Sequence, residues 1–491
     1  MKRIVCPLSA GNNPCATLVA LLALGAAVTV PNACASTRPQ VGGTLRVQMS
    51  ERVSAIDPRQ WPSAPAQAAA AERVDALVFD RLVTLDERGT LQPALAISWQ
   101  HDAQFKRWQF RIREGVKFSD GSPLTSPVAA LALQQSLGIS FDVSATSDSV
   151  VIRVEHPVPQ LLSELAAGRY FVFHVAEDNS LVGTGPFRVA EWAAGGSGNS
   201  IFVANENCWA GRPFVDKIEL AMGVDFQQQA SAISFGQADV VELPAYQVRR
   251  AAQRGVRTAS SDPVESFALA IDPSRPGVQD ARVRQAISLS IDRASIADVI
   301  LQKQGIMAGG LLPNWISGYA HLFPATFDMA RAKELLAASG RELSHPMPLV
   351  LFYDSGDAEA RAVADRVAVN LREIGIMVQV SGQTADGKTK APVADLRLVR
   401  QRISMPDPAA ALSRLLSSLG EAAPAALETP EQIYAAERAP IDAFRVIPLA
   451  HITESYGLSP QVRDWMPPRW GGWNLADVWL GPPSGAGGNS P

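Results

Sequence analysis

Asp354 and Asp357 form an acidic pair that would suit general acid–base chemistry, in which one carboxyl group donates a proton and the other accepts one or attacks. Both belong to a polar turn at the end of the apolar segment 347–354, which has the composition of a buried strand. Acids at such positions usually cap an element or face solvent. We therefore interpret the pair as a polar cap and not as catalytic groups.

Other patterns that carry chemistry are missing from the sequence. It contains no H-x-x-x-H or C-x-x-C pair, no Walker-type phosphate loop and no G-x-S-x-G nucleophile turn. The glycine-rich segment 195–200 lacks the lysine and the helix of a phosphate cradle, so a hairpin loop is the better interpretation. The sequence thus predicts no catalytic residue, no metal site and no cofactor. The histidines are scattered at His101, His156, His174, His321, His345 and His451.

The segment RISMPDPAA, residues 402–410, raises a different question, because two prolines bracket Asp407. Proline fixes φ and pushes the preceding residue toward extended backbone, so the segment is predicted to be a loop. Local chemistry alone favours a connector between two elements. A loop at such a place can also form one wall of a binding site.

The elements that would hold these residues differ between the two halves of the chain. Segments 44–49, 107–112, 148–154 and 216–222 are predicted strands, of which 107–112 alternates between apolar and polar residues. The second half alternates strands with helices, which is typical of a parallel α/β sheet. Its predicted strands are 347–354, 376–382 and 394–400, and its predicted helices are 281–304, interrupted at Asp292 as an N-cap, 327–340 with Asp328 as N-cap and Gly340 at the C-terminal end, and 358–375.

The N-terminal residues have the pattern of a secretory signal. Lys2 and Arg3 precede the uncharged apolar run 16–30, and small residues follow at 33–35. Fifteen apolar residues are short for a bilayer span of about 20. We predict secretion through a signal peptide, 1–35, with lipid modification at Cys34 as the alternative. After its removal Cys208 is the one cysteine that is certain to stay, which excludes an internal disulfide framework.

Length and charge limit the classes of protein. The chain has 491 residues, of which 47% are hydrophobic, and predicts two or three domains. Loss of residues 1–35 changes the formal net charge from −4 to −6, and an acidic surface argues against a nucleic-acid partner. The last residues, 481–491, are predicted to be a disordered tail.

Several segments together resemble the family 5 extracellular solute-binding proteins of ABC importers, which include peptide- and nickel-binding proteins. Each segment is weak evidence by itself, but all occur in the family's order over nearly the whole mature chain. They are GGTLRV (42–47), DRLVTLDERGTLQPALAISW (80–99), WQFRIREGVKFSDGSPLT (108–125), GTGPFRVAEW (183–192), NENCWAGRPFVDKIEL (205–220), DARVRQAISLSIDRASI (280–296), FDMARAKELLAASG (327–340), LREIGIMVQV (371–380), MPDP (405–408) and GWNLADVWL (472–480).

The resemblance implies an α/β, two-lobed periplasmic-binding-protein fold of class II type, with a hinge and a ligand cleft between the lobes. Lobe II is expected to be one stretch, 268–440. Lobe I is expected to be made of 36–75, 183–267 and 441–480, with a reduced subdomain at 76–182. A protein of this kind closes about its hinge on a ligand and is expected to be a monomer that meets an inner-membrane ABC permease.

The departures from the family pattern bear on the ligand. In peptide-binding members an acid pairs with the ligand's ammonium group, and Ser404 stands at that position and supplies no charge. The resemblance makes Trp61, Asp272, Gln401, Arg402 and Ser404 the candidate ligand-binding residues. Gln401 and Ser404 suit a neutral polar ligand, whereas Arg402 suits an anionic group or a solvent-facing role. Asp407 is expected to be a turn cap.

The predicted function is that of a solute-binding component of an ABC importer, for a peptide-like or other small organic solute. Two alternatives are a ligand sensor on the same fold and a periplasmic hydrolase. The hydrolase requires a catalytic constellation that the sequence lacks, so we expect no enzyme activity. Neighbouring permease and ATPase genes would separate the importer from the sensor.

Overall fold

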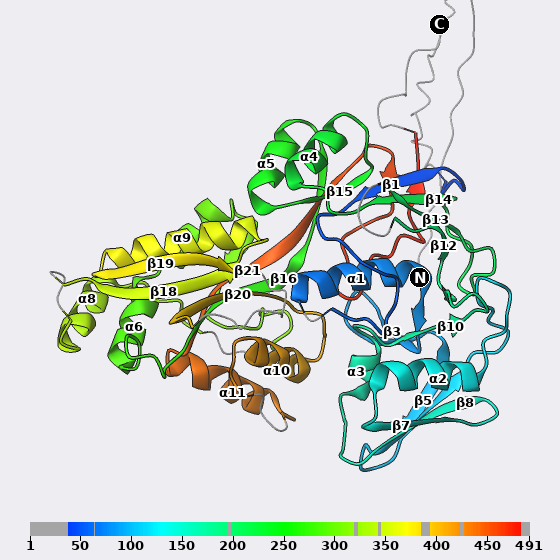
Figure 1. Cartoon of the computed structure of the whole chain (residues 1–491), viewed down its shortest axis with the longest axis horizontal. Coiled ribbons are helices and arrows are strands. Elements are labelled where there is room, and N and C mark those ends of the chain that lie inside the picture. Colours follow the sequence, from blue (N-terminus) through cyan, green and yellow to red (C-terminus); the bar gives the residue numbers. More distant parts are fainter. Residues whose placement is uncertain are drawn as a thin grey trace, which may run out of the picture. The chain divides into compact units, whose positions relative to one another are not determined.

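Two long antiparallel strands run through the centre of the large sheet in the computed structural model (Figure 1). They are β16 (Arg257–Ile271) and β21 (Val446–Leu458), paired from Arg257 opposite Leu458 to Ala270 opposite Val446. Their register shifts around Pro263. The structure describes residues 38–62, 64–193, 198–318, 323–341, 345–383, 393–422 and 427–482.

The large sheet continues to both sides of this central pair, in the order β12-β13-β14-β1-β15-β21-β16-β20-β18-β19, with β17 also paired to β21. On one side β1 is parallel to β14 and β15, and on the other β18 is parallel to β19 and β20, as predicted for the second half. The other strands of this sheet are β1 (Thr44–Gln48), β12 (Phe187–Glu191), β13 (Ser200–Ala204), β14 (Lys217–Ala221), β15 (Val240–Leu243), β17 (Gly305–Met307), β18 (Met347–Asp354), β19 (Ile376–Gln383) and β20 (Leu396–Arg402).

A smaller four-stranded sheet, in the order β5-β6-β8-β7, lies within the predicted subdomain and is drawn in cyan with α2 in Figure 1. Its strands are β5 (Ala96–His101), β6 (Arg107–Ile112), β7 (Phe141–Ala145) and β8 (Ser149–Val154). Other short strands form four further pairs: β2 (Asp80–Arg81) with β9 (Phe171–Val172), β3 (Val83–Leu85) with β4 (Leu91–Pro93), β10 (His174–Val175) with β11 (Leu181–Val182), and β22 (Val462–Arg463) with β23 (Trp479–Leu480).

The helices lie against these sheets, and α9 runs along β18 and β19 (Figure 1). They are α1 (Pro65–Val78), α2 (Ser126–Leu137), α3 (Leu161–Leu165), α4 (Phe226–Ser234), α5 (Ala245–Gln253), α6 (Ala281–Ser290), α7 (Arg293–Ser295), the π-helix η1 (Ile296–Ile300), α8 (Met329–Ala338), α9 (Ala358–Arg372), α10 (Pro408–Ser418) and α11 (Pro430–Asp442).

The predicted helix caps are confirmed. Asp292 accepts from the backbone N–H of Ser295, and Asp328 accepts from that of Arg331. Gly340 follows α8 with φ of +77°, a conformation that favours glycine. Asp407 is the N-cap of α10 and accepts from the N–H of Ala410 at 2.7 Å. The loop predicted over 402–410 is correspondingly shorter, because Arg402 still belongs to β20 and Pro408 already starts α10.

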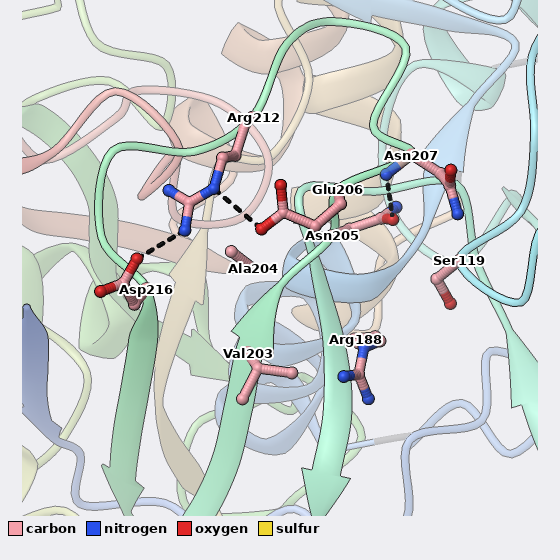
Figure 2. Close-up of a pocket in the computed structure, with 9 residues that line it drawn as sticks. All are labelled: Ser119, Arg188, Val203, Ala204, Asn205, Glu206, Asn207, Arg212 and Asp216. Atoms are coloured by element: carbon pink, nitrogen blue, oxygen red, sulfur yellow. Dashed lines mark hydrogen bonds and ion pairs between the residues drawn. The ribbon is translucent and has the colours of Figure 1, made fainter. Parts of the chain in front are cut away.

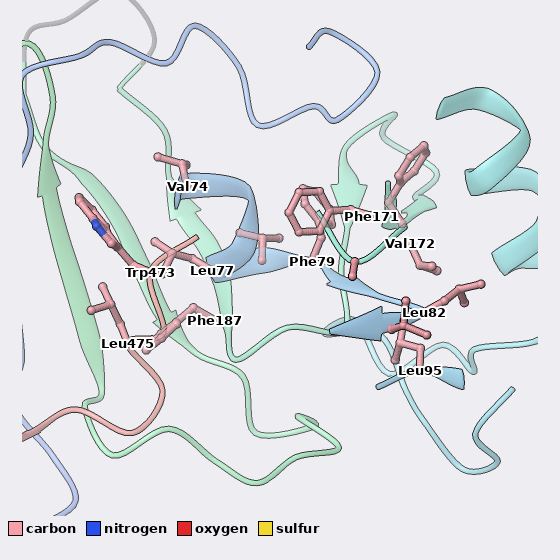
Figure 3. Close-up of a cluster of buried hydrophobic side chains, with 14 of the residues drawn as sticks. Val74, Leu77, Phe79, Leu82, Leu95, Phe171, Val172, Phe187, Trp473 and Leu475 are labelled. Carbon is pink, nitrogen blue, oxygen red and sulfur yellow. The ribbon is translucent and has the colours of Figure 1, made fainter. Parts of the chain in front are cut away.

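The first hydrophobic core packs around α1 (Figure 3). Val74 and Leu77 face Trp473 and Leu475, which come from the last part of the chain. Leu82 is fully buried in the same cluster, so the apolar spacing of this segment marks core positions. Each such side chain stabilises the fold by about 1.5–3 kcal/mol on burial.

A second core forms between α6, α8, α9 and the strands β18 to β20, and it includes Leu351, Val363 and Leu396. Residues of β16 and β21 such as Phe267 and Leu449 belong to this core, whereas Ala259 and Leu458 belong to the first. The two central strands thus contribute to both cores. They tie together the two parts of the sheet.

Three predictions about the organisation of the chain are not tested by the structure. The signal peptide, 1–35, with Cys34, and nearly all of the tail, 481–491, lie outside the described residues. The predicted lobe boundaries at 267/268 and 440/441 fall inside β16 and α11. The division into lobes at those residues stays a prediction.

Candidate functional site

Arg402 and Glu454 form a buried ion pair on two strands that flank β16. Arg402 is the last residue of β20, and Glu454 lies in β21 where the ladder with β16 is irregular. Nε of Arg402 donates to Oε1 of Glu454 at 2.6 Å, and both side chains are 8% exposed. A buried pair of this kind needs close geometry, because its desolvation cost is large.

Arg73 extends this pair into the first part of the chain. From α1, its guanidinium contacts Glu454 at 3.0 Å and Glu242 of β15 at 2.7 Å, and it lies over the ring of Trp473 at 5.5 Å from the centroid. Ser50 donates to the same Glu242 with its backbone N–H and its hydroxyl group. The result is a chain of alternating charges that joins α1, β15, β21 and β20.

Arg400 forms a second ion cluster two residues before Arg402 on the same strand. It contacts Glu265 of β16 at 2.5 Å, Asp357 at 3.1 Å and Glu359 at 3.0 Å. Asp357 is also the N-cap of α9, where its Oδ1 accepts from the backbone N–H groups of Glu359 and Ala360. The cap prediction for Asp357 is therefore right, but its other oxygen has a second partner.

Burial and neighbouring charges shift the pKa values of these acids in opposite directions. Burial alone would raise the pKa of Glu454, but the positive charges of Arg402 and Arg73 hold it at about 2. Burial, together with the charge of Glu454, keeps the pKa of Glu265 above its usual value despite Arg400. Burial and the nearby charges of Glu242 and Asp354 likewise raise the pKa of Glu51. Perturbed groups of this kind gather at functional sites, which makes this ion network the candidate site.

Some of the ligand-binding residues predicted from the sequence lie at this ion network. Gln401 lies between Arg400 and Arg402 in β20, and its side-chain amide donates to the carbonyl of Arg402 at 3.3 Å. Ser404 follows the strand and accepts from Nη1 of Arg414 at 3.4 Å. Trp61 is partly buried against the first core.

Asp272 lies apart from the others. It follows the opposite end of β16, where Ile271 pairs with Leu396, six ladder positions from the pair of Glu265 with Arg402. At about 3.3 Å per residue this is roughly 20 Å along the strand. Asp272 is exposed and closes a turn by accepting from the backbone N–H and the hydroxyl of Ser274. The structure thus groups Gln401, Arg402 and Ser404 and separates Asp272.

Sequence reasoning missed the acids that hold the arginines. Glu242 interrupts the apolar strand VVEL, and Glu454 lies within HITESY, both in strands that are largely buried. A charged residue in a buried strand needs a partner, which was a usable signal. The identity of the partner was not, because Arg73 lies 169 residues before Glu242.

A separate open cavity of about 380 Å³ lies beside β12 and β13, at the segment NENCW (Figure 2). Figure 2 shows the carboxylate of Glu206 turned toward Arg212, which also contacts Asp216. The residues that line this cavity include none of the ligand-binding residues predicted from the sequence. They are Ser119, Arg188, Val203, Ala204, Asn205, Glu206, Asn207, Arg212 and Asp216.

Two kinds of feature are absent from the described part of the chain. Within those ranges, no group of three or more His, Cys, Asp or Glu side chains is arranged to hold a metal ion. In the same part of the chain, no helix has the length and hydropathy of a membrane span.

Comparison with known proteins gives the family. Residues 90–422 match the bacterial extracellular solute-binding proteins, family 5 Middle. The nickel-binding periplasmic protein of Escherichia coli strain K12 is 27% identical over 348 residues, which cover 62% of this chain and 66% of that protein, just under two thirds of its length.

Solved structures match over nearly their full length. NikA from Brucella suis, in complex with Fe(III)-EDTA, has a TM-score of 0.77 at 20% identity and covers 89% of this chain and 100% of its own. The oligopeptide-binding protein AppA from Bacillus subtilis, in complex with a nonapeptide, has a TM-score of 0.75 at 16% identity and covers 91% and 100%. These likenesses confirm the predicted α/β, two-lobed fold. The chain belongs to the family 5 bacterial extracellular solute-binding proteins.

Proposed function

We propose that this protein is the substrate-binding component of an ABC importer, which captures a peptide-like or other small organic solute between two lobes and delivers it to an inner-membrane permease. The observation that carries the proposal is the family match over residues 90–422. The protein acts outside the cytoplasm after removal of the signal peptide, 1–35, and works as a monomer. Relatives that are named as periplasmic binding proteins support this location.

The solute site of the proposal lies at the ion network and its neighbours. Arg402 ends β20 beside Gln401 and Ser404, next to the place where β16 and β21 pass from one core to the other. Proteins that close on a ligand about a hinge place the ligand beside the strands that cross between lobes. The ligand-binding roles of Trp61 and Asp272 stay predictions, and Asp272 lies outside the proposed solute site.

Binding without chemistry is the better account of the site. Each arginine of the network is matched by carboxylates, which are occupied by these ion pairs. The histidine nearest the network in sequence, His451, contacts the carbonyl of Leu311, and burial lowers its pKa to about 4. We therefore propose that the protein has no enzyme activity.

Native mass spectrometry tests the proposed function. The protein is expressed with its own N-terminal segment, purified from the periplasm without refolding, and measured before and after denaturation. We expect a bound solute of low molecular mass that is released on unfolding. A thermal-shift panel of peptides, oligosaccharides and metal chelates follows. A protein that carries no solute and responds to none of the panel contradicts the proposal, as does turnover of peptides, esters or glycosides.

A further inference from the structure

Arg402 carries a hydrogen-bond donor that has no acceptor among the described residues. Its Nε is bound by Glu454 at 2.6 Å, and its Nη2 reaches the carbonyl of Pro468 at 3.5 Å. Its Nη1 is buried and has no hydrogen-bond partner among the described residues. The side chain as a whole is 8% exposed. Buried donors are nearly always paired, and an unpaired one costs free energy, so this atom is a candidate donor to a bound solute.

The position of this donor is fixed from several sides. Arg402 pairs with Glu265 in a ladder of seven consecutive partners between β20 and β16. Its guanidinium shares Oε1 of Glu454 with Arg73. A group held in this way is suited to recognition, because little side-chain freedom is lost when a ligand binds.

The charges around the donor limit what its acceptor can be. Arg73, Arg400 and Arg402 are the three cations of the network. Five carboxylates form ion pairs with them, so acids outnumber arginines five to three. The acids are Glu242, Glu265, Asp357, Glu359 and Glu454.

Burial, and to a smaller extent the charge of neighbouring carboxylates, raises the pKa values of Glu51 and Glu265. A carboxylate on a ligand would add one more negative charge to this region. An uncharged oxygen accepts from Nη1 without that repulsion. The excess of carboxylates is compatible with a ligand whose other groups are neutral or positively charged.

We propose that Nη1 of Arg402 donates to an uncharged oxygen of the bound solute, an amide carbonyl or a hydroxyl group, and that Arg402 thereby selects neutral solutes over carboxylates. The inference rests on the proposed binding function and narrows its ligand. It assigns Arg402 the opposite role from one that meets an anionic group. Amide-containing and hydroxyl-containing solutes both offer an uncharged oxygen that accepts a hydrogen bond, and the experiment distinguishes between them.

Calorimetry with matched probes tests the inference. N-acetyl-trialanine amide and maltotriose supply uncharged oxygens as amide and hydroxyl groups, and N-acetyl-trialanine supplies the same peptide with a free carboxylate. We expect at least one of the two neutral probes to bind. If N-acetyl-trialanine amide binds, its affinity should be about tenfold or more higher than that of N-acetyl-trialanine. The Arg402→Lys variant keeps the charge opposite Glu454 but loses Nη1, and should bind the neutral probe about tenfold more weakly.

Arg397→Lys is the matched control, since Arg397 is an exposed residue of the same strand that pairs with Ala270 at the opposite end. The Arg397→Lys variant should bind each probe with the affinity of the wild type. The inference is overturned if neither neutral probe binds, if the acid binds as tightly as its amide, or if Arg402→Lys retains the wild-type affinity. A carboxylate solute found by native mass spectrometry overturns this inference and leaves the proposed function standing. A protein that binds no solute of any class removes both.

Discussion

Glu359, in the first turn of α9, accepts a hydrogen bond from the backbone N–H of Ala245 at the start of α5. The two residues are 114 positions apart and belong to segments predicted for different lobes. The second oxygen of the same carboxylate contacts Arg400 at 3.0 Å. One buried side chain, 7% exposed, thus links α5, α9 and β20.

Substitutions of Glu359 separate its two roles. Glu359→Gln keeps an acceptor for the Ala245 N–H and removes only the charge, which Asp357 and Glu265 still supply to Arg400. Glu359→Ala leaves the buried N–H unpaired. We expect Glu359→Ala to lower the free energy of unfolding by about 2 kcal/mol more than Glu359→Gln, measured by urea denaturation. Equal losses for the two variants would show that the charge alone matters.

Removal of the charge of Glu454 should be more severe. Glu454→Gln leaves the buried Arg402 without its carboxylate and leaves Arg73 with Glu242 alone, and breaking a buried pair typically costs about 3–5 kcal/mol. Asp442→Asn removes one partner of the exposed Arg438–Asp442 pair and serves as the control, with no measurable loss expected. Denaturation of both variants beside the wild type measures the difference. A loss for Glu454→Gln as small as that of the control contradicts the prediction.

Glu437 gives a pH dependence of stability. Burial raises its pKa to about 7, while its Oε1 accepts from the backbone N–H groups of Leu311 and Leu312. The folded state therefore binds a proton that the unfolded state releases near pH 4.5, so stability is lost as pH rises from about 4.5 to about 7. Relative to Glu437→Gln, which does not titrate, the wild type should lose about 3 kcal/mol of unfolding free energy over this interval. Parallel denaturation curves at each pH, with a constant difference, would contradict it.

Gly89 tests the contact between the β3–β4 turn and the loop before α10. Its φ is +79°, and a Cβ there would lie 2.7 Å from Cβ of Pro406 and 3.3 Å from Nε1 of Trp470. Gly115 has φ of +76° and nothing within 4 Å, so Gly115→Ala carries the same backbone cost without the collision. We expect Gly89→Ala to lower unfolding free energy by about 1–3 kcal/mol more than Gly115→Ala. Faster amide exchange in residues 403–407 of Gly89→Ala alone would locate the effect.

Ser404→Asp restores the acid that peptide-binding relatives are expected to carry. The variant should bind trialanine, with its free ammonium group, several-fold more tightly than the wild type does, and should not gain affinity for N-acetyl-trialanine. Arg414 lies 3.4 Å from the hydroxyl of Ser404 and would compete for the new carboxylate, so Ser404→Asp is also measured with Arg414→Met. Tight binding of trialanine by the wild type would contradict the role assigned to Ser404.

Local chemistry allowed the helix ends to be predicted, because Asp292 and Asp328 each cap within a few residues of their own position. The parallel strands of the second half could also be predicted, since strand and helix alternate there at regular spacing. The ion network could not, because Arg73 and Glu454 are far apart in the sequence and only the tertiary fold brings them together. The same holds for Glu242, whose partners come from α1 and from the loop after β1.

The central place of β21 has a consequence for the order of assembly. Strands β15 and β16 follow each other closely in the sequence, yet β21, which begins at Val446, lies between them. The sheet therefore lacks its middle strand until almost the entire chain has left the ribosome. Non-local pairing of this kind is slow and keeps a nascent chain open. An open chain is the form that a secretion channel can thread, so this strand order suits the export that we propose for this protein.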